Sequence, residues 1–397
     1  MKAFCLHTGT RIAPFGDAVS HTVVDGRTLA EVQVSALEAA GCTVVESAPV
    51  GEPYVLFSDR TWFTAEAVRR LMACGLGRFR AGDPSWFDWS GPQQKVEEPG
   101  IYELAVVTGP PAFESAKPVS VDMSLRDLEL DVRQKALEQA GNRNVRVGPA
   151  MVHQVDHWTH IIRINQLSLL ARAENAKLDW DTAGWLRRIW ILLRLILRVR
   201  SLRSGTIARR MCEVGDGVSI HPSAVVEFSI IGDGCDIGPN AVVRGSVMAA
   251  NAKVDSHGTV NASVLGEGAH VGRYGHVNLC TLYPGAMVSS GGGFQSCVFG
   301  RDSFMAWGST VLDLSFGSTV KVEVDGPGSK RVDTHEHFMG SAIGHGAKVG
   351  NGVKIGYGVT IPNDAFIVDG GELLREWGDA PVGEAVVVRD GKPTPVR

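Results

Sequence analysis

The chain has 397 residues, 44% of them hydrophobic, so it is long enough for two or three domains with a sizeable core. Its net charge of -4 argues against nucleic acid as a partner, because binding phosphates requires a surplus of Lys and Arg. The seven cysteines form no CxxC pair and the N-terminus lacks the apolar core of a signal peptide, so we expect a reduced cytoplasmic protein.

Residues 1–150 are expected to form an α/β domain. A helical pattern covers 29–42, a buried strand is expected at 54–58, and Thr64 caps a second helical pattern over 64–75. The apolar run 102–109 is typical of a further parallel strand. Alternating strands and helices favour a doubly wound sheet.

The beginning of this domain resembles sugar-1-phosphate nucleotidylyltransferases. Gly9, Thr10 and Arg11 match the glycine-rich turn of that family, and "LFSDRTWF" is similar to its strand with a metal-binding Asp, here Asp59. The resemblance implies that these four residues bind a nucleotide. A plain structural turn is the alternative for Gly9–Arg11.

Two departures from that family concern its activity. Ser20 and His21 stand where the family has proline and lysine, so the cation that offsets the triphosphate charge is missing. The interval between Cys42 and Tyr54 is too short for the segment that recognises the base. We therefore expect a shrunken, inactive nucleotidylyltransferase-like domain.

A helical connector is expected over 151–210, and its part 157–174 is similar to the connector of two-domain members of that family. His153, Asp156, His157 and His160 are spaced for one face of a helix. Imidazoles with a carboxylate can hold zinc or iron, which makes the three histidines candidate metal ligands. A polar seam between domains explains the same residues without a metal.

The stretch 185–203 predicts a very apolar helix with Arg187, Arg194 and Arg198 on one stripe. Its longest apolar run is too short to span a bilayer. The combination suits peripheral contact with a membrane surface, or a groove in a partner subunit.

Aliphatic residues from Val214 onward recur every 17 residues, in steps of 6, 6 and 5. This spacing predicts three short strands per turn and a triangular parallel β-solenoid over 211–372, followed by a tail over 373–397. Glycine follows many of these residues, where we expect a corner with unusual φ and ψ. The three columns are Val214, Ile231, Met248, Leu265, Leu282, Phe299 and Phe316; Ile220, Ile237, Val254, Val271, Val288, Met305 and Val322; Val226, Val243, Val260, Val277, Phe294 and Val311; they resume at Ile343, Val349, Ile355, Ile361 and Ile367.

This pattern resembles the hexapeptide-repeat family, whose fold is a left-handed parallel β-helix. The resemblance implies a homotrimer with active sites in grooves between subunits, and acetyl-CoA or another acyl-CoA as co-substrate. His270 and His276 each precede a column residue and so point outward from successive faces. We expect His276 to be the general base, with His270 as second choice. Two surface-facing corner histidines are the alternative.

The repeat loses step over 317–342, which predicts an expelled loop that carries specificity. "VDGPGSK" resembles a sugar-binding loop of the bifunctional acetyltransferase and uridylyltransferase that makes UDP-N-acetylglucosamine, in which a Gly-His pair like Gly275-His276 supplies the base. Asp325 and Lys330 would then contact substrate. His335 and His337 would share a face if they lay in a strand, and they are further substrate-binding candidates, with solvated loop histidines as the alternative.

We therefore predict an acyltransferase that modifies a sugar-like or other amine- or hydroxyl-bearing small molecule. The alternative is a non-catalytic trimeric binding or scaffold protein derived from a bifunctional enzyme. An active nucleotidylyltransferase is disfavoured by the missing lysine. A metal-dependent lyase or hydratase with His221 and His257 lacks a second partner histidine.

Overall fold

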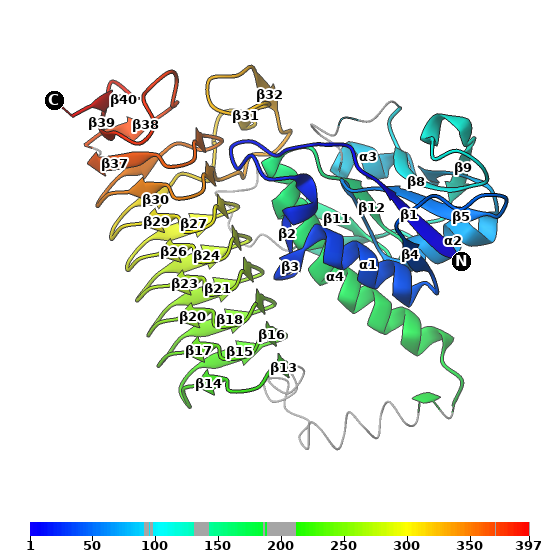
Figure 1. Cartoon of the computed structure of the whole chain (residues 1–397). Coiled ribbons are helices and arrows are strands. Elements are labelled where there is room, and N and C mark those ends of the chain that lie inside the picture. Colours follow the sequence, from blue (N-terminus) through cyan, green and yellow to red (C-terminus); the bar gives the residue numbers. More distant parts are fainter. Residues whose placement is uncertain are drawn as a thin grey trace. The chain divides into compact units, whose positions relative to one another are not determined.

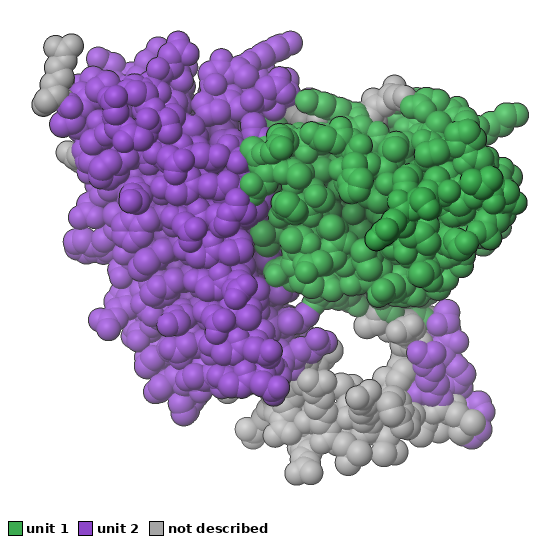
Figure 2. Space-filling model, viewed as in Figure 1, with its two compact units in different colours: residues 1–12, 16–178 green, residues 13–15, 179–397 purple. Residues whose placement is uncertain are grey.

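The computed structural model describes residues 1–90, 95, 98–130, 143–185, 187–188, 212–369 and 371–396 (Figure 1). The chain divides into two compact units, residues 1–12 with 16–178 and residues 13–15 with 179–397 (Figure 2). Each unit has a hydrophobic core of its own. Within the described ranges, no helix combines the length and the apolar character needed to cross a membrane.

The first unit is built on a six-stranded sheet with the strand order β4-β1-β5-β8-β7-β9. Its strands are β1 (Lys2–Leu6), β4 (Thr43–Val45), β5 (Tyr54–Ser58), β7 (Gly77–Ala81), β8 (Ile101–Val107) and β9 (Pro118–Val121). The strand predicted at 54–58 is confirmed. The strand predicted at 102–109 is present, but it runs antiparallel to both β5 and β7, so the expected parallel direction is wrong. Its apolar run reflects burial on both faces, which does not depend on strand direction.

Threonine residues cap the N-termini of two helices of this unit. Thr28 precedes α1 (Leu29–Ala39) in a capping box: its Oγ1 accepts the Glu31 N–H at 3.3 Å, and the Glu31 carboxylate accepts the Thr28 N–H at 2.8 Å. Thr64 caps α2 (Ala65–Cys74), as predicted. The smaller elements are η1 (Val19–His21), β2 (Val23–Val24), β3 (Arg27–Thr28), β6 (Thr61–Phe63), α3 (Ser85–Ser90), η2 (Phe113–Ser115), β10 (Arg126–Leu130), β11 (Arg143–Val147) and β12 (Val152–Gln154).

The helix of the connector, α4 (Trp158–Thr182), begins later than the histidine spacing predicts. His153 lies on β12, which pairs antiparallel with β6, and His157 lies just before the helix. The prediction that the three histidines and Asp156 share one helical face is therefore wrong. Pairing of residues 152–154 with 61–63 holds this segment extended, and such a long-range contact is not visible in local spacing.

The second unit is a parallel β-helix whose coils stack in the register of the 17-residue repeat, consistent with the left-handed form (Figure 1). One face consists of β13 (Glu213–Val214), β16 (Ile230–Ile231), β19 (Val247–Met248), β22 (Val264–Leu265), β25 (Thr281–Leu282), β28 (Val298–Phe299), β33 (Ala342–Ile343) and β36 (Thr360–Ile361). The second consists of β14 (Ser219–Ile220), β17 (Asp236–Ile237), β20 (Lys253–Val254), β23 (His270–Val271), β26 (Met287–Val288), β29 (Phe304–Met305), β34 (Lys348–Val349) and β37 (Phe366–Asp369). The third consists of β15 (Val225–Glu227), β18 (Val242–Arg244), β21 (Thr259–Asn261), β24 (His276–Asn278) and β27 (Gly293–Gln295), and then β30 (Thr310–Val311), β35 (Lys354–Ile355) and β38 (Leu373–Leu374).

Two of the predicted column residues lie outside the stack. Phe316 is 72% exposed, and Val322 lies in the expelled hairpin formed by β31 (Lys321–Glu323) and β32 (Arg331–Asp333). The columns continue instead through Ile343 and Val349, which pair with the coil before the hairpin. A period of 17 can persist by chance in an inserted segment, and only strand pairing shows which residue enters the stack.

The glycines that follow the column residues have a different role from the one expected. A Cβ on Gly266 would stand 2.7 Å from the backbone nitrogen of Pro284 in the next coil, so this position needs glycine for close approach. Positive φ occurs two residues later, as at Gly268 with φ 64°. The stacking distance between coils thus selects the first glycine, and backbone conformation selects the second.

The described part of the predicted tail, residues 373–396, packs onto the end of the β-helix. Strand β39 (Ala385–Arg389) pairs parallel with β37, and β40 (Lys392–Pro395) returns antiparallel to it. A hairpin at the end of a stack covers an edge that would otherwise be open to pairing with another chain.

Candidate functional site

His276 lies on the outer surface of β24, and its side chain is exposed. The next residue, Val277, is fully buried in the column, so the alternation of the strand directs His276 outward, as predicted. Its in-register neighbours on the adjacent coils are Thr259 and Gly293. The imidazole of His276 is therefore exposed on the outer face and has small residues in register on both adjacent coils.

His270 lies on the second face, on β23, and is half-buried. Its Nε2 lies 3.1 Å from Oδ1 of Asp255 on the preceding coil. The two histidines belong to different faces of one coil, and the sequence correctly predicted that they point outward from separate faces.

The segment 317–342, which includes the expelled hairpin, carries the four predicted substrate-binding residues. Asp325 and Lys330 lie in the turn between β31 and β32, which follows β30, two coils beyond β24. His335 has a positive φ of 56° and lies after the end of β32, so it does not share a strand face with His337. The Nδ1 atom of His337 lies 3.2 Å from the Ser315 carbonyl oxygen.

A buried carboxyl group supports the turn of this hairpin. Glu323 is 3% exposed, and its Oε1 accepts the backbone N–H of Gly328 at 3.0 Å. Burial raises the pKa of Glu323 above its usual range. The loop that contains Asp325 and Lys330 is thus anchored from inside the fold.

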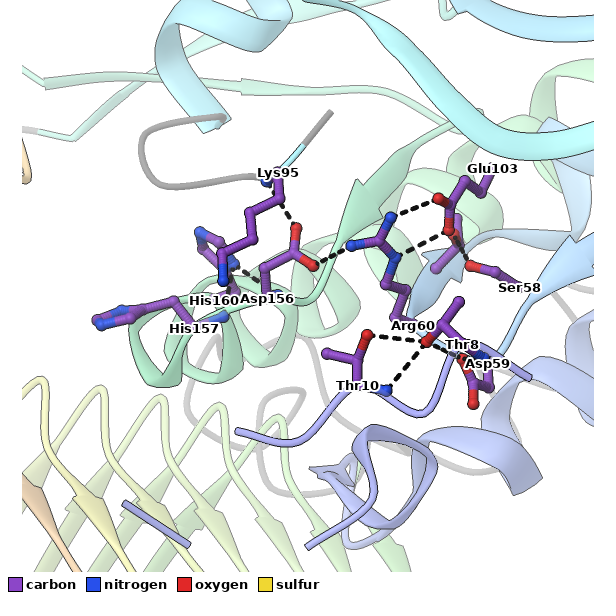
Figure 3. Close-up of polar contacts among 11 residues, drawn as sticks. Thr8, Thr10, Ser58, Asp59, Arg60, Lys95, Glu103, Asp156, His157 and His160 are labelled. Atoms are coloured by element: carbon purple, nitrogen blue, oxygen red, sulfur yellow. Dashed lines mark hydrogen bonds and ion pairs between the residues drawn. The ribbon is translucent and has the colours of Figure 1, made fainter. Parts of the chain in front are cut away.

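In the first unit, the predicted nucleotide-binding residues lie at the carboxyl ends of β1 and β5, which are neighbouring parallel strands. Thr8 joins the two loops: its N–H and its Oγ1 both donate to Oδ1 of Asp59, at 3.0 and 2.7 Å, and its Oγ1 lies 2.8 Å from Oγ1 of Thr10 (Figure 3). Gly9 has a φ of 70°, and Arg11 donates to the Gly16 carbonyl. Asp59 is 5% exposed and is occupied in tying the loops together.

Next to this pair of loops, Arg60 bridges two carboxylates. Its guanidinium donates to Oδ1 of Asp156 at 2.7 Å and makes a bidentate contact with Glu103 (Figure 3). Asp156 also accepts the backbone N–H of Lys95 at 2.8 Å, and its side chain is 1% exposed. Burial raises the pKa of Asp156, although Arg60 opposes this shift.

The three candidate metal ligands are buried in the same unit. The Nδ1 atom of His160 accepts the backbone N–H groups of Asp156 and His157 at 3.0 and 3.2 Å, at the start of α4. The centroids of the His153 and His160 rings lie 5.1 Å apart. Among the residues that the structure describes, no group of three or more His, Cys, Asp or Glu side chains is arranged to hold a metal ion. His160 thus acts as a cap of the helix, and we do not propose a metal here.

Most of the predicted arginine-rich helix, 185–203, lies outside the described residues, so neither its membrane nor its partner interpretation is tested.

The sequence analysis missed the Arg60 bridge, because Glu103 and Asp156 are far from Arg60 along the chain. It also missed two exposed aromatic side chains of the β-helix, those of Tyr274 and Trp307. Their isolation as aromatic residues at glycine-rich corners was the available signal.

One family model matches the beginning of the β-helix. Residues 211–245 match the model of the bacterial transferase hexapeptide family (six repeats), so the predicted hexapeptide repeat is confirmed there. The chain matches no curated protein. The likeness of the first unit to nucleotidylyltransferases stays a prediction.

Three acetyltransferases are among the similar solved structures. The polysialic acid O-acetyltransferase OatWY is 16% identical over 46% of this chain and 87% of its own, with a TM-score of 0.24. The polySia-specific acetyltransferase NeuO is 16% identical over 46% of this chain and 81% of its own, with a TM-score of 0.19. The acetyltransferase domain of PglB from Neisseria gonorrhoeae is 19% identical over 45% of this chain and 57% of its own, with a TM-score of 0.12.

Proposed function

We propose that the chain is an acyltransferase that uses His276 as general base, with an acyl-CoA as donor and a sugar-like or other amine- or hydroxyl-bearing molecule as acceptor. The observation that carries this proposal is the exposed imidazole of His276 on the outer face of a rigid β-helix. The match of residues 211–245 to a transferase repeat family supports it.

In the proposed reaction, His276 takes the proton of the acceptor hydroxyl or amine. The acceptor oxygen or nitrogen then attacks the thioester carbonyl carbon, the new C–O or C–N bond forms as the C–S bond breaks, and the CoA thiolate leaves and takes up a proton. Backbone N–H groups next to the carbonyl oxygen would stabilise its developing negative charge. Asp325 and Lys330 are proposed substrate contacts from the expelled hairpin.

We also propose a homotrimer, because an exposed base on a flat face needs an opposing surface that excludes water from the reaction. Light scattering should then give three times the monomer mass of 42.5 kDa. A stable monomer would contradict this part of the proposal.

The test is a screen of acceptors with acetyl-CoA that measures release of free thiol, with wild type, His276→Ala, His270→Ala and His221→Ala compared. His221 is the matched control, because it is another exposed histidine of the β-helix and lies just after β14. We expect His276→Ala to lower turnover by about 10²–10⁴-fold and His221→Ala to leave it unchanged. Equal turnover in wild type and His276→Ala would remove this residue from the mechanism. Absence of turnover with any acceptor would favour the non-catalytic scaffold.

A further inference from the structure

Gly293 occupies the position on β27 that lies in register with His276 on β24. Its backbone is that of an ordinary strand residue, and its φ is not positive. A Cβ built on Gly293 meets no atom within 4 Å. Glycine within a strand weakens it and often marks the close approach of a ligand. Neither backbone conformation nor packing within the chain therefore explains this glycine.

On the coil before His276 and on the coil after Gly293, the corresponding position carries a β-branched side chain. Thr259 is the other in-register neighbour of His276, and Thr310 follows Gly293 after 17 residues and donates to its carbonyl oxygen at 3.3 Å. β-Branched residues are the side chains that a strand surface favours. The outer face therefore lacks a side chain next to His276, on the side toward Thr310.

We propose that Gly293 is a specificity-determining residue, and that the open space at this glycine admits a carbohydrate acceptor with a pyranose ring to the imidazole of His276. This inference rests on the proposed acyltransferase function.

Two exposed aromatic side chains indicate a ring-shaped acceptor. Tyr274 is 65% exposed at the corner before β24, and Trp307 is 66% exposed at the corner before β30, one coil to either side of the corner that leads to Gly293. The Trp307 indole nitrogen lies 2.9 Å from the place of a Cβ on Gly291, so the indole leans over that corner. The Tyr274 ring stacks on His257, with 4.9 Å between centroids. Such aromatic faces can pack against the C–H groups of a sugar ring.

Polar side chains on the same outer face suit the hydroxyl groups of such a ring. Asn278 and Gln295 lie in register two residues beyond His276 and Gly293, and the Asn278 Nδ2 donates to the Gln295 Oε1 at 2.7 Å. This contact leaves the Asn278 carbonyl oxygen as acceptor and the Gln295 amide as donor. Apolar faces together with neutral hydrogen-bonding groups match a neutral carbohydrate better than a charged acceptor.

The experiment compares Gly293→Val with Thr259→Val and His276→Ala in the full-length chain. Thr259→Val is the matched control, because that neighbour of His276 is already β-branched. One readout is kcat/KM for a pyranoside and for a linear amino alcohol, each with acetyl-CoA. The other is the rate at which diethyl pyrocarbonate modifies His276, followed by peptide mass spectrometry, which needs no turnover. Thermal unfolding verifies that each variant is folded.

We expect Gly293→Val to lower kcat/KM for the pyranoside about tenfold or more, and to slow modification of His276, with no fall in Tm. Thr259→Val should change both readouts by less than about twofold, as expected for a nearly isosteric surface change. A Gly293→Val variant that keeps its activity and its modification rate, while His276→Ala is inactive, would overturn the inference and leave the proposed function standing. Wild-type activity in His276→Ala would overturn the proposed function instead. If Gly293→Val lowered kcat/KM for the linear amino alcohol as much as for the pyranoside, the assigned substrate class would be refuted.

Discussion

Removal of the Arg60 guanidinium should destabilise the first unit more than any surface ion pair does. Arg60 lies between Glu103 and Asp156, and the Asp156 side chain is 1% exposed. Arg60→Met keeps most of the side-chain volume but leaves two carboxylates near each other without their cation. Breaking a buried pair in this way costs about 3–5 kcal/mol. That cost corresponds to an increase of about 150- to 5,000-fold in the population of locally opened molecules.

The pH dependence of this loss identifies its electrostatic origin. Burial holds the pKa of Asp156 above its usual range even with Arg60 present, and without Arg60 the pKa rises further. A carboxyl group with a raised pKa in the folded state destabilises the fold only when it ionises. The deficit of Arg60→Met should therefore be complete above the raised pKa, and it should shrink as the pH falls toward the unfolded-state value of about 3.9 for Asp.

Hydrogen–deuterium exchange, read on peptides from β5, β8 and β12 along a urea series, measures this local stability at each pH. Arg80→Met is the matched control, because the Arg80–Glu98 pair spans 2.8 Å with side chains 41% and 57% exposed and should contribute about 0.2–1 kcal/mol at most. Arg60→Lys, which keeps a charge but loses the bidentate contact, should fall between the two. A deficit of Arg60→Met that equals that of Arg80→Met, or that does not change with pH, would refute the reasoning.

Three further outcomes are expected. Thr28→Ala removes the capping box of α1 and should lower the stability of the first unit by about 1 kcal/mol in urea unfolding, with faster exchange confined to the start of that helix. Phe299→Ala should lower the unfolding free energy of the β-helix by about 3–5 kcal/mol. The Phe316 side chain is 72% exposed, so Phe316→Ala should change that free energy by less than about 0.5 kcal/mol. Similar losses at both positions would contradict the assignment of Phe299 to the stack. Glu323→Gln keeps an acceptor for the Gly328 N–H but cannot ionise. Because the pKa of Glu323 is raised in the folded protein, wild-type stability falls as the pH rises from the unfolded-state pKa through the folded-state pKa. The Tm of Glu323→Gln should therefore exceed that of wild type at pH 8 and match it near pH 4, and a constant difference in Tm across that range would contradict this account.

The β-helix shows how far local pattern alone can predict a fold. Each coil repeats one inward aliphatic residue per face, so the spacing of Leu265 and Leu282 already predicts their pairing in adjacent coils. The outward direction of His276 follows from the same alternation, because its strand neighbour Val277 enters the core. The hydrophobic period therefore determined the architecture, the column residues of the regular coils and the surface on which the candidate base lies, but not the column residues at the expelled hairpin.

Contacts between distant segments decided the rest. Strand β8 shows the same apolar run whether it pairs parallel or antiparallel, and only its partners β5 and β7 give its direction. His153 fits a helical spacing but pairs in a strand, and Phe316 fits the period but is left outside the stack. Arg60, Glu103 and Asp156 form one network across about a hundred residues of sequence. Local periodicity reports which side chains must be buried, whereas strand direction, insertions and ion pairs depend on which segments meet, and that choice is made by tertiary packing.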